Sequence, residues 1–334
     1  MWSSHYKAGV NDALDPRPRP RSPRVALATS TEAWSLDEDA PLLTAALADV
    51  GLDARGVVWD DPDVDWSAFE LVVIRSTWDY ATRHREFIEW TERVQAVTDL
   101  RNPAAVIAWN TDKRYLADLA DDGVAVTPTT FLTTPMPEAE VSERIAESVG
   151  SDRGIVVKPT VSAGSKDTAR YASRAEDPHA LGAAATHAAS LLDRGRAVMV
   201  QPYLDSVDDD GADGGETGLV FLGGTFSHAF RKGPMLHVGA DAVDGLYAPE
   251  EIEPREPTEE QLAVASQTID VTRRRCGTDL LYARVDLLDD ADGRPVVLEL
   301  ELTEPSFFLT TDPGAASSAA AAIVAAATTA AAGR

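Results

Sequence analysis

The sequence is poor in several features that would define a function class. Cysteine occurs once, at Cys276, so no disulfide can form within the chain and a reducing cytoplasm is the expected compartment. Basic residues are few, because 30 lysines and arginines stand against 55 acidic residues, giving a formal net charge of −25 at pH 7. Proteins that bind nucleic acid need a basic face for the phosphates, so nucleic acid is not an expected partner.

Long apolar runs are also missing, apart from the alanine-rich residues 315–332. Alanine is only weakly apolar but has the highest helix propensity, which predicts a packed terminal helix and no membrane span. The first 23 residues mix prolines with arginines and lack the apolar core of a signal peptide. This composition predicts a disordered basic tail.

Two motifs of common enzyme classes are absent as well. No GxGxxG turn follows the first strands, so an NAD(P) oxidoreductase is unsupported. We find no Ser-His-Asp or Cys-His set, which fits chemistry that needs no nucleophilic side chain. We interpret Cys276 as a packing residue.

The chain length fits two or three packed lobes, and the pattern of apolar residues predicts an α/β protein. Residues 24–108 alternate strands with helices, which is typical of a doubly wound parallel sheet. The rhythm changes in residues 109–203, and in the last region the strands come in pairs, which suggests an antiparallel sheet. The expected helices are 37–50, 83–97, 112–121, 138–149, 180–193 and 259–275. The expected strands are 24–30, 54–59, 71–75, 130–132, 154–159 and 197–203, with strand pairs in 217–231 and 281–302.

The last strand pair carries an unusual set of charges, formed by Arg284, Asp286, Glu299 and Glu301. Residues two apart on a strand share a face, so a hairpin would gather three carboxylates and a guanidinium on one side. Without a partner, these carboxylates would repel each other and be costly to desolvate. Mg²⁺ prefers such oxygen ligands, and Arg284 could pair with a phosphate. The alternative is a solvated hairpin face.

Other candidates for contact with a nucleotide lie upstream. Lys158 ends an apolar strand and Lys113 opens a helix, and each is either a surface lysine or a point charge for phosphate oxygens. A loop whose small residues allow close backbone approach follows Lys158, formed by Ser162, Ala163, Gly164 and Ser165. A proline-interrupted strand exit that could leave backbone groups free for an adenine edge is formed by Gln201, Pro202, Tyr203 and Leu204.

Taken in this order, the motifs between about residues 100 and 315 resemble the ATP-grasp superfamily. Glu299-x-Glu301 is similar to the family's glutamate-x-asparagine metal pair, with Glu301 in the asparagine place, a departure that adds negative charge. The resemblance implies an ATP-grasp fold of three lobes, in which residues 109–203 and 204–334 form two α+β subdomains. It also implies that ATP lies between the second and third lobes and that the protein uses ATP and Mg²⁺. The runs RSTWDY (75–80), FSHAFRK (226–232) and ELTEPS (301–306) further resemble proteins of the O-ureido-D-serine cyclo-ligase type, which close the ring of D-cycloserine, an antibiotic.

The resemblance implies an ATP- and Mg²⁺-dependent ligase that forms a carbon–nitrogen bond through an acyl phosphate. A small amino-acid-like molecule is the expected substrate, and no membrane is expected as a partner. The sequence leaves open whether the product is cyclic or linear and whether the protein forms a homodimer. The alternatives are an ATP-grasp small-molecule kinase and a catalytically silent nucleotide-binding protein.

The expected site residues fall into four groups. Mg²⁺ is assigned to Asp286, Glu299 and Glu301. ATP is assigned to Lys113, Lys158, Ser162–Ser165 and Gln201–Leu204. The catalytic cations are Arg231, Arg284 and Lys232, with Arg231 as the candidate oxyanion donor. The substrate is assigned to Arg75, Ser76, Thr77, Asp79, His228, Glu304 and Ser306.

Some of these assignments have a structural alternative. The run 75–80 follows a strand end, where open α/β sheets bind ligands. Arg75 and Asp79 could instead form a salt-bridged turn, and His228 could be structural. The loops 161–168 and 205–215 are the expected lids that exclude water from the site.

Overall fold

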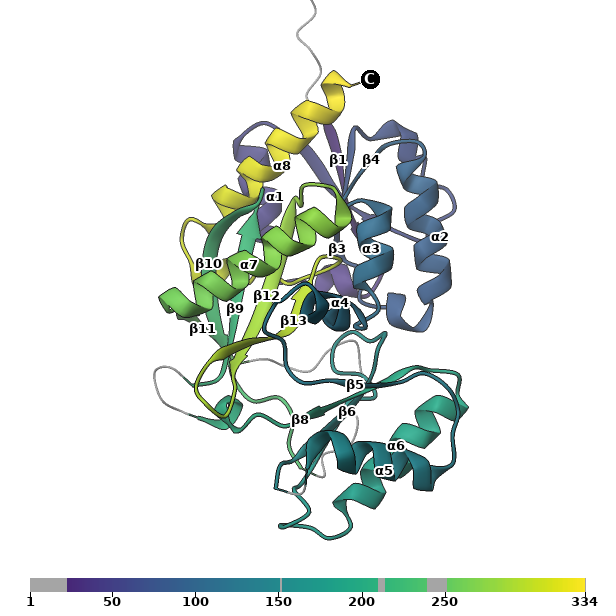
Figure 1. Ribbon diagram of the computed structural model, residues 1–334. Helices are drawn as coiled ribbons and strands as arrows, with labels where there is room; N and C mark the ends of the chain where they lie inside the picture. Colours follow the sequence, from purple (N-terminus) through teal and green to yellow (C-terminus); the bar gives the residue numbers. More distant parts are fainter. Residues whose placement is uncertain (1–22, 151, 210–213, 239–250, 334) are drawn as a thin grey trace, which may run out of the picture.

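The structure is a computed structural model that describes residues 23–150, 152–209, 214–238 and 251–333. The predicted tail therefore lies outside the described residues, apart from Pro23, and so does the middle of the second predicted lid, residues 210–213. The chain forms three sheets, and the second sheet with its helices lies below the other two in Figure 1.

The first sheet has four parallel strands in the order β2-β1-β3-β4. The strands are β1 (Arg24–Thr29), β2 (Asp53–Val58), β3 (Leu71–Ser76) and β4 (Asp99–Arg101). The helices beside them are α1 (Asp39–Asp49), α2 (His84–Gln95) and α3 (Ala104–Asn110). Along β1, Leu27 packs with Leu43 of α1, whereas Ala28 packs with Phe87 of α2. Both faces of the sheet are therefore covered, which confirms the predicted doubly wound arrangement.

The second sheet has the order β5-β8-β6-β7 and is antiparallel throughout. Its strands are β5 (Thr130–Leu132), β6 (Ile155–Pro159), β7 (Ala169–Tyr171) and β8 (Val198–Pro202). The helices α5 (Glu138–Val149) and α6 (Ala180–Asp193) pack against one face of it (Figure 1). The short helix α4 (Tyr115–Asp121) precedes this unit.

The third sheet has five antiparallel strands in the order β11-β10-β9-β12-β13. They are β9 (Glu216–Leu222), β10 (Thr225–Lys232), β11 (Ile252–Arg255), β12 (Tyr282–Asp289) and β13 (Pro295–Glu301). The helix α7 (Glu259–Cys276) begins at a capping box between Thr258 and Gln261 and ends before Gly277, which has a left-handed φ of 64°. Its buried side packs on this sheet, with Cys276 partly buried against the same core.

Side chains from the first part of the chain hold the edge strand β13 in place. Asn110 accepts from Leu302 N and donates to Leu300 O, both at 2.7–2.8 Å, and Tyr115 accepts from Leu300 N at 2.8 Å. Asn102 donates to Leu302 O at 2.8 Å. These bonds fix the register of the strand that carries Glu299 and Glu301.

The last helix, α8 (Ala315–Ala332), packs against α1 and the first sheet (Figure 1). In the described part of the chain it is the one helix that is long and apolar enough to cross a membrane, judged by length and composition. Ala319, Ala320, Ile323 and Ala327 of α8 are buried in the same core as Leu43 and Leu47. Tertiary contacts of this kind are what we predicted for this segment.

The structure contains elements that were not predicted. The strands β4, β7 and β11 have three or four residues each, too few for an alternating pattern to stand out. The helix α3 spans the predicted lobe boundary at residue 108. The helix expected over 112–121 begins at Tyr115, so Lys113 lies in the turn before it.

Candidate active site

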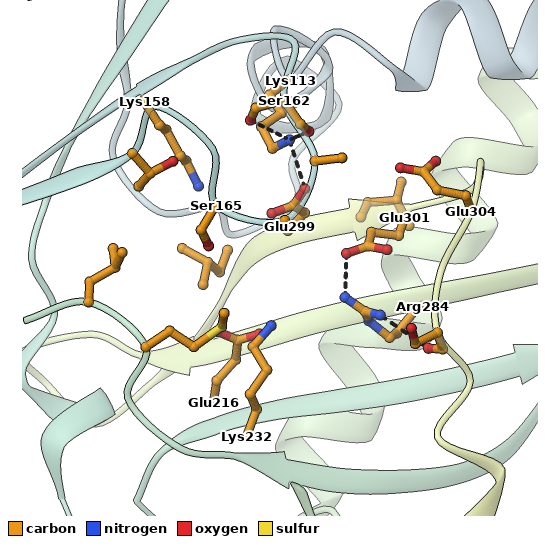
Figure 2. A pocket seen from close by; sticks show the side chains of 18 of the residues that line it. Lys113, Lys158, Ser162, Ser165, Glu216, Lys232, Arg284, Glu299, Glu301 and Glu304 are labelled. Carbon is orange, nitrogen blue, oxygen red and sulfur yellow. Dashed lines mark hydrogen bonds and ion pairs between the residues drawn. The ribbon is translucent and has the colours of Figure 1, made fainter. Parts of the chain in front are cut away.

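A cavity of about 520 Å³ lies where the three sheets meet. Its lining comes from the second sheet on one side, from β9, β10, β12 and β13 on another, and from the segments 36–39, 78–80 and 304–310. One end of the cavity is apolar and the other is charged. Figure 2 shows the charged side chains in the middle of it.

The apolar end is a slot made by side chains of the second and third sheets. Val156, Leu204, Leu288 and the ring of Tyr203 belong to one buried cluster, and all four line the cavity. The hydroxyl of Tyr203 donates to Asp208 at 2.7 Å, which fixes the orientation of its ring. A flat apolar slot beside the backbone of residues 201–204 suits an aromatic heterocycle such as a purine base.

Two lysines lie between this slot and the charged end. Lys158 is 9% exposed at the end of β6, and burial lowers the pKa of its ammonium group. Figure 2 shows that ammonium group pointing into the cavity. Lys113 donates to Ser162 O at 2.9 Å and forms an ion pair of 3.0 Å with Glu299. Lys113 thus links the loop after β6 to β13.

The carboxylates of the charged end have very different pKa values. Burial raises the pKa of Glu299, but the ammonium groups of Lys113 and Lys158 outweigh burial and hold it at about 2. Burial raises the pKa of Glu301 to about 8, although Arg284 opposes the shift. Burial likewise raises the pKa of Glu304 to about 7, against the effect of Lys113. The cavity therefore holds more buried negative charge than its own cations stabilise.

Arg284 ties two of the acidic groups together. Its guanidinium donates to both oxygens of Asp286 at 2.8–3.1 Å, and it also forms an ion pair with Glu301. The same guanidinium donates to Ser306 O at 3.1 Å. The predicted hairpin pairs Arg284 with Glu301 and Asp286 with Glu299 across β12 and β13.

A second buried ion pair closes the floor of the cavity. Lys232 and Glu216 are directly opposite each other on β10 and β9, with Nζ and Oε1 2.9 Å apart. Burial raises the pKa of Glu216, against the effect of Lys232. Figure 2 shows this pair below Ser165.

The loop of small residues after β6 crosses to the first sheet. Gly164 and Ser165 both have a φ of 59°, in the left-handed region, so the chain turns sharply there. Val161 and Ala163 pack against the aromatic core around Phe87. The loop thereby covers one side of the cavity, with its small side chains facing the space.

Most of the residues assigned from sequence line this cavity. They are Lys113, Lys158, Ser162, Ala163, Gly164, Ser165, Gln201, Pro202, Tyr203, Leu204, Lys232, Arg284, Glu299, Glu301, Glu304 and Ser306. They come from the second and third sheets and the segments that connect them, so the fold brings together motifs that lie up to about 190 residues apart.

The expectation for Arg231 is corrected by the structure. Side chains alternate along a strand, so neighbours on β10 face opposite sides, and it is Lys232 that faces the cavity. Arg231 instead donates to Gly214 O at 3.1 Å and Asp209 O at 3.3 Å. Asp286 is likewise 1% exposed below the cavity lining, held by Arg284.

The residues assigned to substrate on β3 are also placed away from the cavity. Arg75 is 2% exposed, donates to Pro305 O at 3.0 Å and forms an ion pair with Asp39 at 3.3 Å. Ser76 bonds the hydroxyl of Thr29 at 2.8 Å, and Thr77 is fully buried. Arg75 therefore connects β3 to the segment after β13, whereas Ser76 bonds within the first sheet, and none of the three lines the cavity.

Two further residues assigned to the substrate have partners within the protein. Asp79 accepts from Trp59 Nε1 at 3.0 Å and lies 3.5 Å from Arg83, so its ion pair is with Arg83 and not with Arg75 as in the alternative. His228 donates from Nε2 to Phe307 O at 2.6 Å, and burial lowers its pKa. Both lie outside the cavity lining.

Several lining residues were not predicted. Trp78 and Tyr80 are the members of the run 75–80 that reach the cavity, and Asn110 reaches it from α3. Asp37 also lines it, is 5% exposed, and its Oδ2 has no hydrogen-bond partner among the described residues. No motif in the sequence marks the segment before α1. Tyr80 could have been suggested by its place in the run 75–80, where it follows Trp78 after the end of β3.

A metal site is not preassembled. Within the ranges that the structure describes, no group of three or more His, Cys, Asp and Glu side chains is arranged to hold a metal ion. Glu299 and Glu301 face the cavity as hard oxygen ligands, and burial raises the pKa of Glu301 even though Arg284 pairs with it. These two glutamates therefore fit a divalent cation, whereas Asp286 is 1% exposed and lies outside the cavity lining.

Comparison with known structures defines the class of protein. D-alanine–D-alanine ligase from Bacillus anthracis complexed with ATP matches 92% of this chain and 98% of its own, with a TM-score of 0.61 at 14% identity. The ATP-grasp ligase PsnB complexed with a minimal precursor matches 92% of this chain and 99% of its own, with a TM-score of 0.57 at 18% identity. The fold is that of the ATP-grasp ligases, which form carbon–nitrogen bonds and as a class use ATP and Mg²⁺.

Closer relatives define the family within that class. The crystal structure of D-cycloserine synthetase DcsG covers 91% of this chain and 99% of its own, with a TM-score of 0.82 at 38% identity. The cycloserine biosynthesis protein DcsG of Streptomyces lavendulae is 41% identical over 292 residues, which are 86% of this chain and 93% of that protein. Residues 25–102 match the family described as the N-terminal domain of D-cycloserine synthetase DcsG. The chain belongs to the DcsG family of ATP-grasp ligases.

Proposed function

We propose that this protein is an ATP- and Mg²⁺-dependent ligase that activates a carboxylate as an acyl phosphate and captures it with a nitrogen nucleophile. The observation that carries the proposal is the single cavity in which an apolar slot leads to buried lysines and glutamates. That order suits ATP, with its base in the slot and its phosphates at the charged end. The relationship to DcsG points to an amino-acid derivative in antibiotic biosynthesis.

On the nucleotide side, the base lies against Val156 and Leu204, and the backbone of residues 201–204 faces its edge. Lys158 and Lys113 bind phosphate oxygens as point charges. The loop 161–168 covers the phosphates and excludes water, which would hydrolyse an acyl phosphate. Lys232 and Arg284 replace Arg231 as the cations beside the transferring group.

Glu299 and Glu301 are the residues that would hold Mg²⁺, together with phosphate oxygens. When bound there, Mg²⁺ would neutralise charge on the phosphates and polarise the group that is transferred. Arg284 holds Glu301 in place through their ion pair, and Lys113 does the same for Glu299. Both glutamates are therefore oriented before any ligand arrives.

On the other side of the cavity, the substrate is held by the segments 36–39, 78–80 and 304–310. The unpartnered Oδ2 of Asp37 suits an ammonium group, because a buried carboxylate oxygen without a hydrogen bond is costly. Ser306 and Tyr80 add hydroxyl groups to the same wall. A small zwitterionic amino-acid derivative such as O-ureido-D-serine fits this chemistry, and its own nitrogen would close a ring.

The test uses the full chain with ATP, Mg²⁺ and O-ureido-D-serine. We expect ADP release that depends on both the metal and the substrate, and a product whose mass shows a new carbon–nitrogen bond. D-serine, which lacks the ureido nitrogen, is the matched control and should give no ligated product. A stable phosphorylated product would instead identify a kinase, and nucleotide binding without ADP release across a panel of amino-acid derivatives would identify a silent binding protein.

A further inference from the structure

The apolar slot at one end of the cavity includes a wall that has no regular secondary structure. Val156 and Tyr203 belong to the second sheet and the turn that follows it, whereas Leu236 lies after β10 and packs against the same cluster. All three line the cavity. Residues 233–237 form neither a helix nor a strand, so contacts from other parts of the chain must hold Leu236 in place.

Arg170 of the strand β7 supplies such contacts. Its guanidinium lies 3.3 Å from the centre of the Tyr203 ring, donates to Leu236 O at 3.3 Å and pairs with Asp208 at 3.1 Å. Asp208 in turn accepts from the hydroxyl of Tyr203 at 2.7 Å. The backbone of Arg170 also forms an isolated β-bridge with Val238. One residue therefore ties the segment after β10 to the turn after β8.

Arg170 supports the slot from behind. Its side chain is 18% exposed, and Arg170 is not among the residues that line the cavity. A ligand in the slot would meet Tyr203 and Leu236, whereas Arg170 would contact only these walls. Arginine suits this position because a planar guanidinium can stack on an aromatic ring and donate hydrogen bonds in its own plane, which the ammonium group of lysine cannot do.

We propose that Arg170 is a positioning residue for the nucleotide, which keeps the base slot assembled before ATP arrives. The inference rests on the proposed ligase function and goes beyond it by assigning the closure of the slot to a residue that touches neither ATP nor the substrate. A preformed slot binds more tightly, because no binding free energy is used to assemble it. The effect concerns the base, since Lys158 and Lys113 lie nearer the charged end of the cavity.

The experiment compares two ligands that share the phosphates but not the base. Calorimetry measures the Kd of the full chain for ATP and for tripolyphosphate, both in the presence of Mg²⁺. In Arg170→Met the Kd for ATP should rise about 10–100-fold, as expected for the loss of charged hydrogen bonds, and the Kd for tripolyphosphate should stay the same. Lys158→Met should instead weaken the binding of both ligands. At saturating ATP, Arg170→Met should keep the wild-type kcat and the wild-type KM for the amino-acid substrate.

Hydrogen exchange without any ligand tests the assembly of the slot directly. The backbone N–H groups of residues 233–238 should exchange faster in Arg170→Met, because the bond to Leu236 O no longer holds that segment. Arg170→Lys keeps a positive charge beside Asp208 but loses the planar fork, so its Kd for ATP should be intermediate. Arg174→Met is the matched control, because Arg174 is exposed just after β7 and outside the cavity lining, and both quantities should stay unchanged.

Three results would contradict this role of Arg170. They are an equal loss of affinity for ATP and tripolyphosphate in Arg170→Met, an unchanged affinity for ATP, and weaker ATP binding with unchanged hydrogen exchange in residues 233–238. Failure of the proposed ligase function would appear separately, in a wild-type protein that binds ATP but forms no ligated product. The binding and exchange measurements would then still decide the role of Arg170, because neither requires turnover.

Discussion

The proposed nucleotide side and the proposed substrate side of the cavity differ in how far apart in the chain their residues lie. The nucleotide side comes mainly from β6, β8 and the loop between β6 and β7, all within one sheet. The substrate side joins the segments 36–39, 78–80 and 304–310 from two different sheets and their connections. The first side is local and carries recognisable motifs, whereas the second side exists only through tertiary contacts.

Asp39 is the residue that assembles the substrate side. Its carboxylate accepts from the backbone N–H groups of Phe307 at 2.6 Å, Phe308 at 3.2 Å and Leu309 at 2.7 Å. It also pairs with Arg75, whose guanidinium lies 3.7 Å from the centre of the Phe307 ring. One carboxylate therefore holds the wall that contains Ser306 and Phe308 against the start of α1. A substitution of Asp39 should therefore affect the substrate side and leave the nucleotide side unchanged.

The largest expected effect follows from Asp39→Asn. Both members of the Arg75–Asp39 pair are nearly fully buried, and removing one charge leaves the other uncompensated, at a cost of about 3–5 kcal/mol. We expect that loss in the free energy of unfolding in urea, together with a raised KM for the amino-acid substrate. Asp65→Asn is the control, because Asp65 also accepts from a backbone N–H, that of Ser67 at 3.1 Å, but it lies on the surface and its bond joins neighbours in the sequence. A change confined to the KM for ATP would contradict the division into two sides.

Lys158→Met tests the nucleotide side and should have the next largest effect. Loss of a buried phosphate-binding charge should lower kcat/KM about 10²–10³-fold, in the range seen for electrostatic contacts in active sites. Stability should rise instead of falling, because burial lowers the pKa of Lys158 and folding therefore opposes its charge. The unfolded chain binds that proton more tightly, so the gain in stability should shrink as the pH rises toward the ordinary lysine pKa.

Thermal unfolding at several pH values, together with steady-state kinetics, measures both effects of Lys158→Met. Arg174→Met is the control, because Arg174 is an exposed cation outside the loop 161–168 and should change neither quantity. A less stable Lys158→Met protein with unchanged activity would mean that Lys158 has a structural role.

The smallest effect is expected from Arg196→Ala. Arg196 donates to Val161 O at 2.7 Å and pairs with Asp167, so it anchors both ends of the loop over the phosphates. The pair is partly exposed, so its loss should cost about 1 kcal/mol or less and raise the KM for ATP a few-fold. Arg194→Ala is the control, since Arg194 is more exposed and lies 3.7 Å from Asp167. An increase confined to the KM of the amino-acid substrate would contradict this assignment.

The comparison also explains which site residues sequence analysis could find. Alternation along two adjacent strands predicted that Glu299 and Glu301 share a face with Arg284, because a hairpin is a local structure. The same reasoning failed at FSHAFRK, where the pattern alone could not decide which of Arg231 and Lys232 faces the cavity. That choice depends on the register with β9, where Lys232 meets Glu216.

The run RSTWDY (75–80) shows which features of the site sequence analysis could not predict. Its place at a strand end correctly drew attention to the region, yet Arg75 faces partners 36 and 230 residues away in the sequence. The chain turns after Ser76, so strand alternation no longer applies, and Trp78 and Tyr80 reach the cavity in its place. A ligand site and an interdomain contact can have the same composition, and only the position of Asp39 distinguishes them.

The sequence by itself determined the alternation of strands and helices, the parallel character of the first sheet and the ordered motifs of an ATP-grasp ligase, because each depends on short-range periodicity or on local residue types. Tertiary structure alone decided which charges face one another, since the pKa values of Glu299, Glu301 and Glu304 depend on lysines, arginines and burial contributed by distant segments. Electrostatic energy depends on distance in space, and distance in space is what the order of residues leaves open.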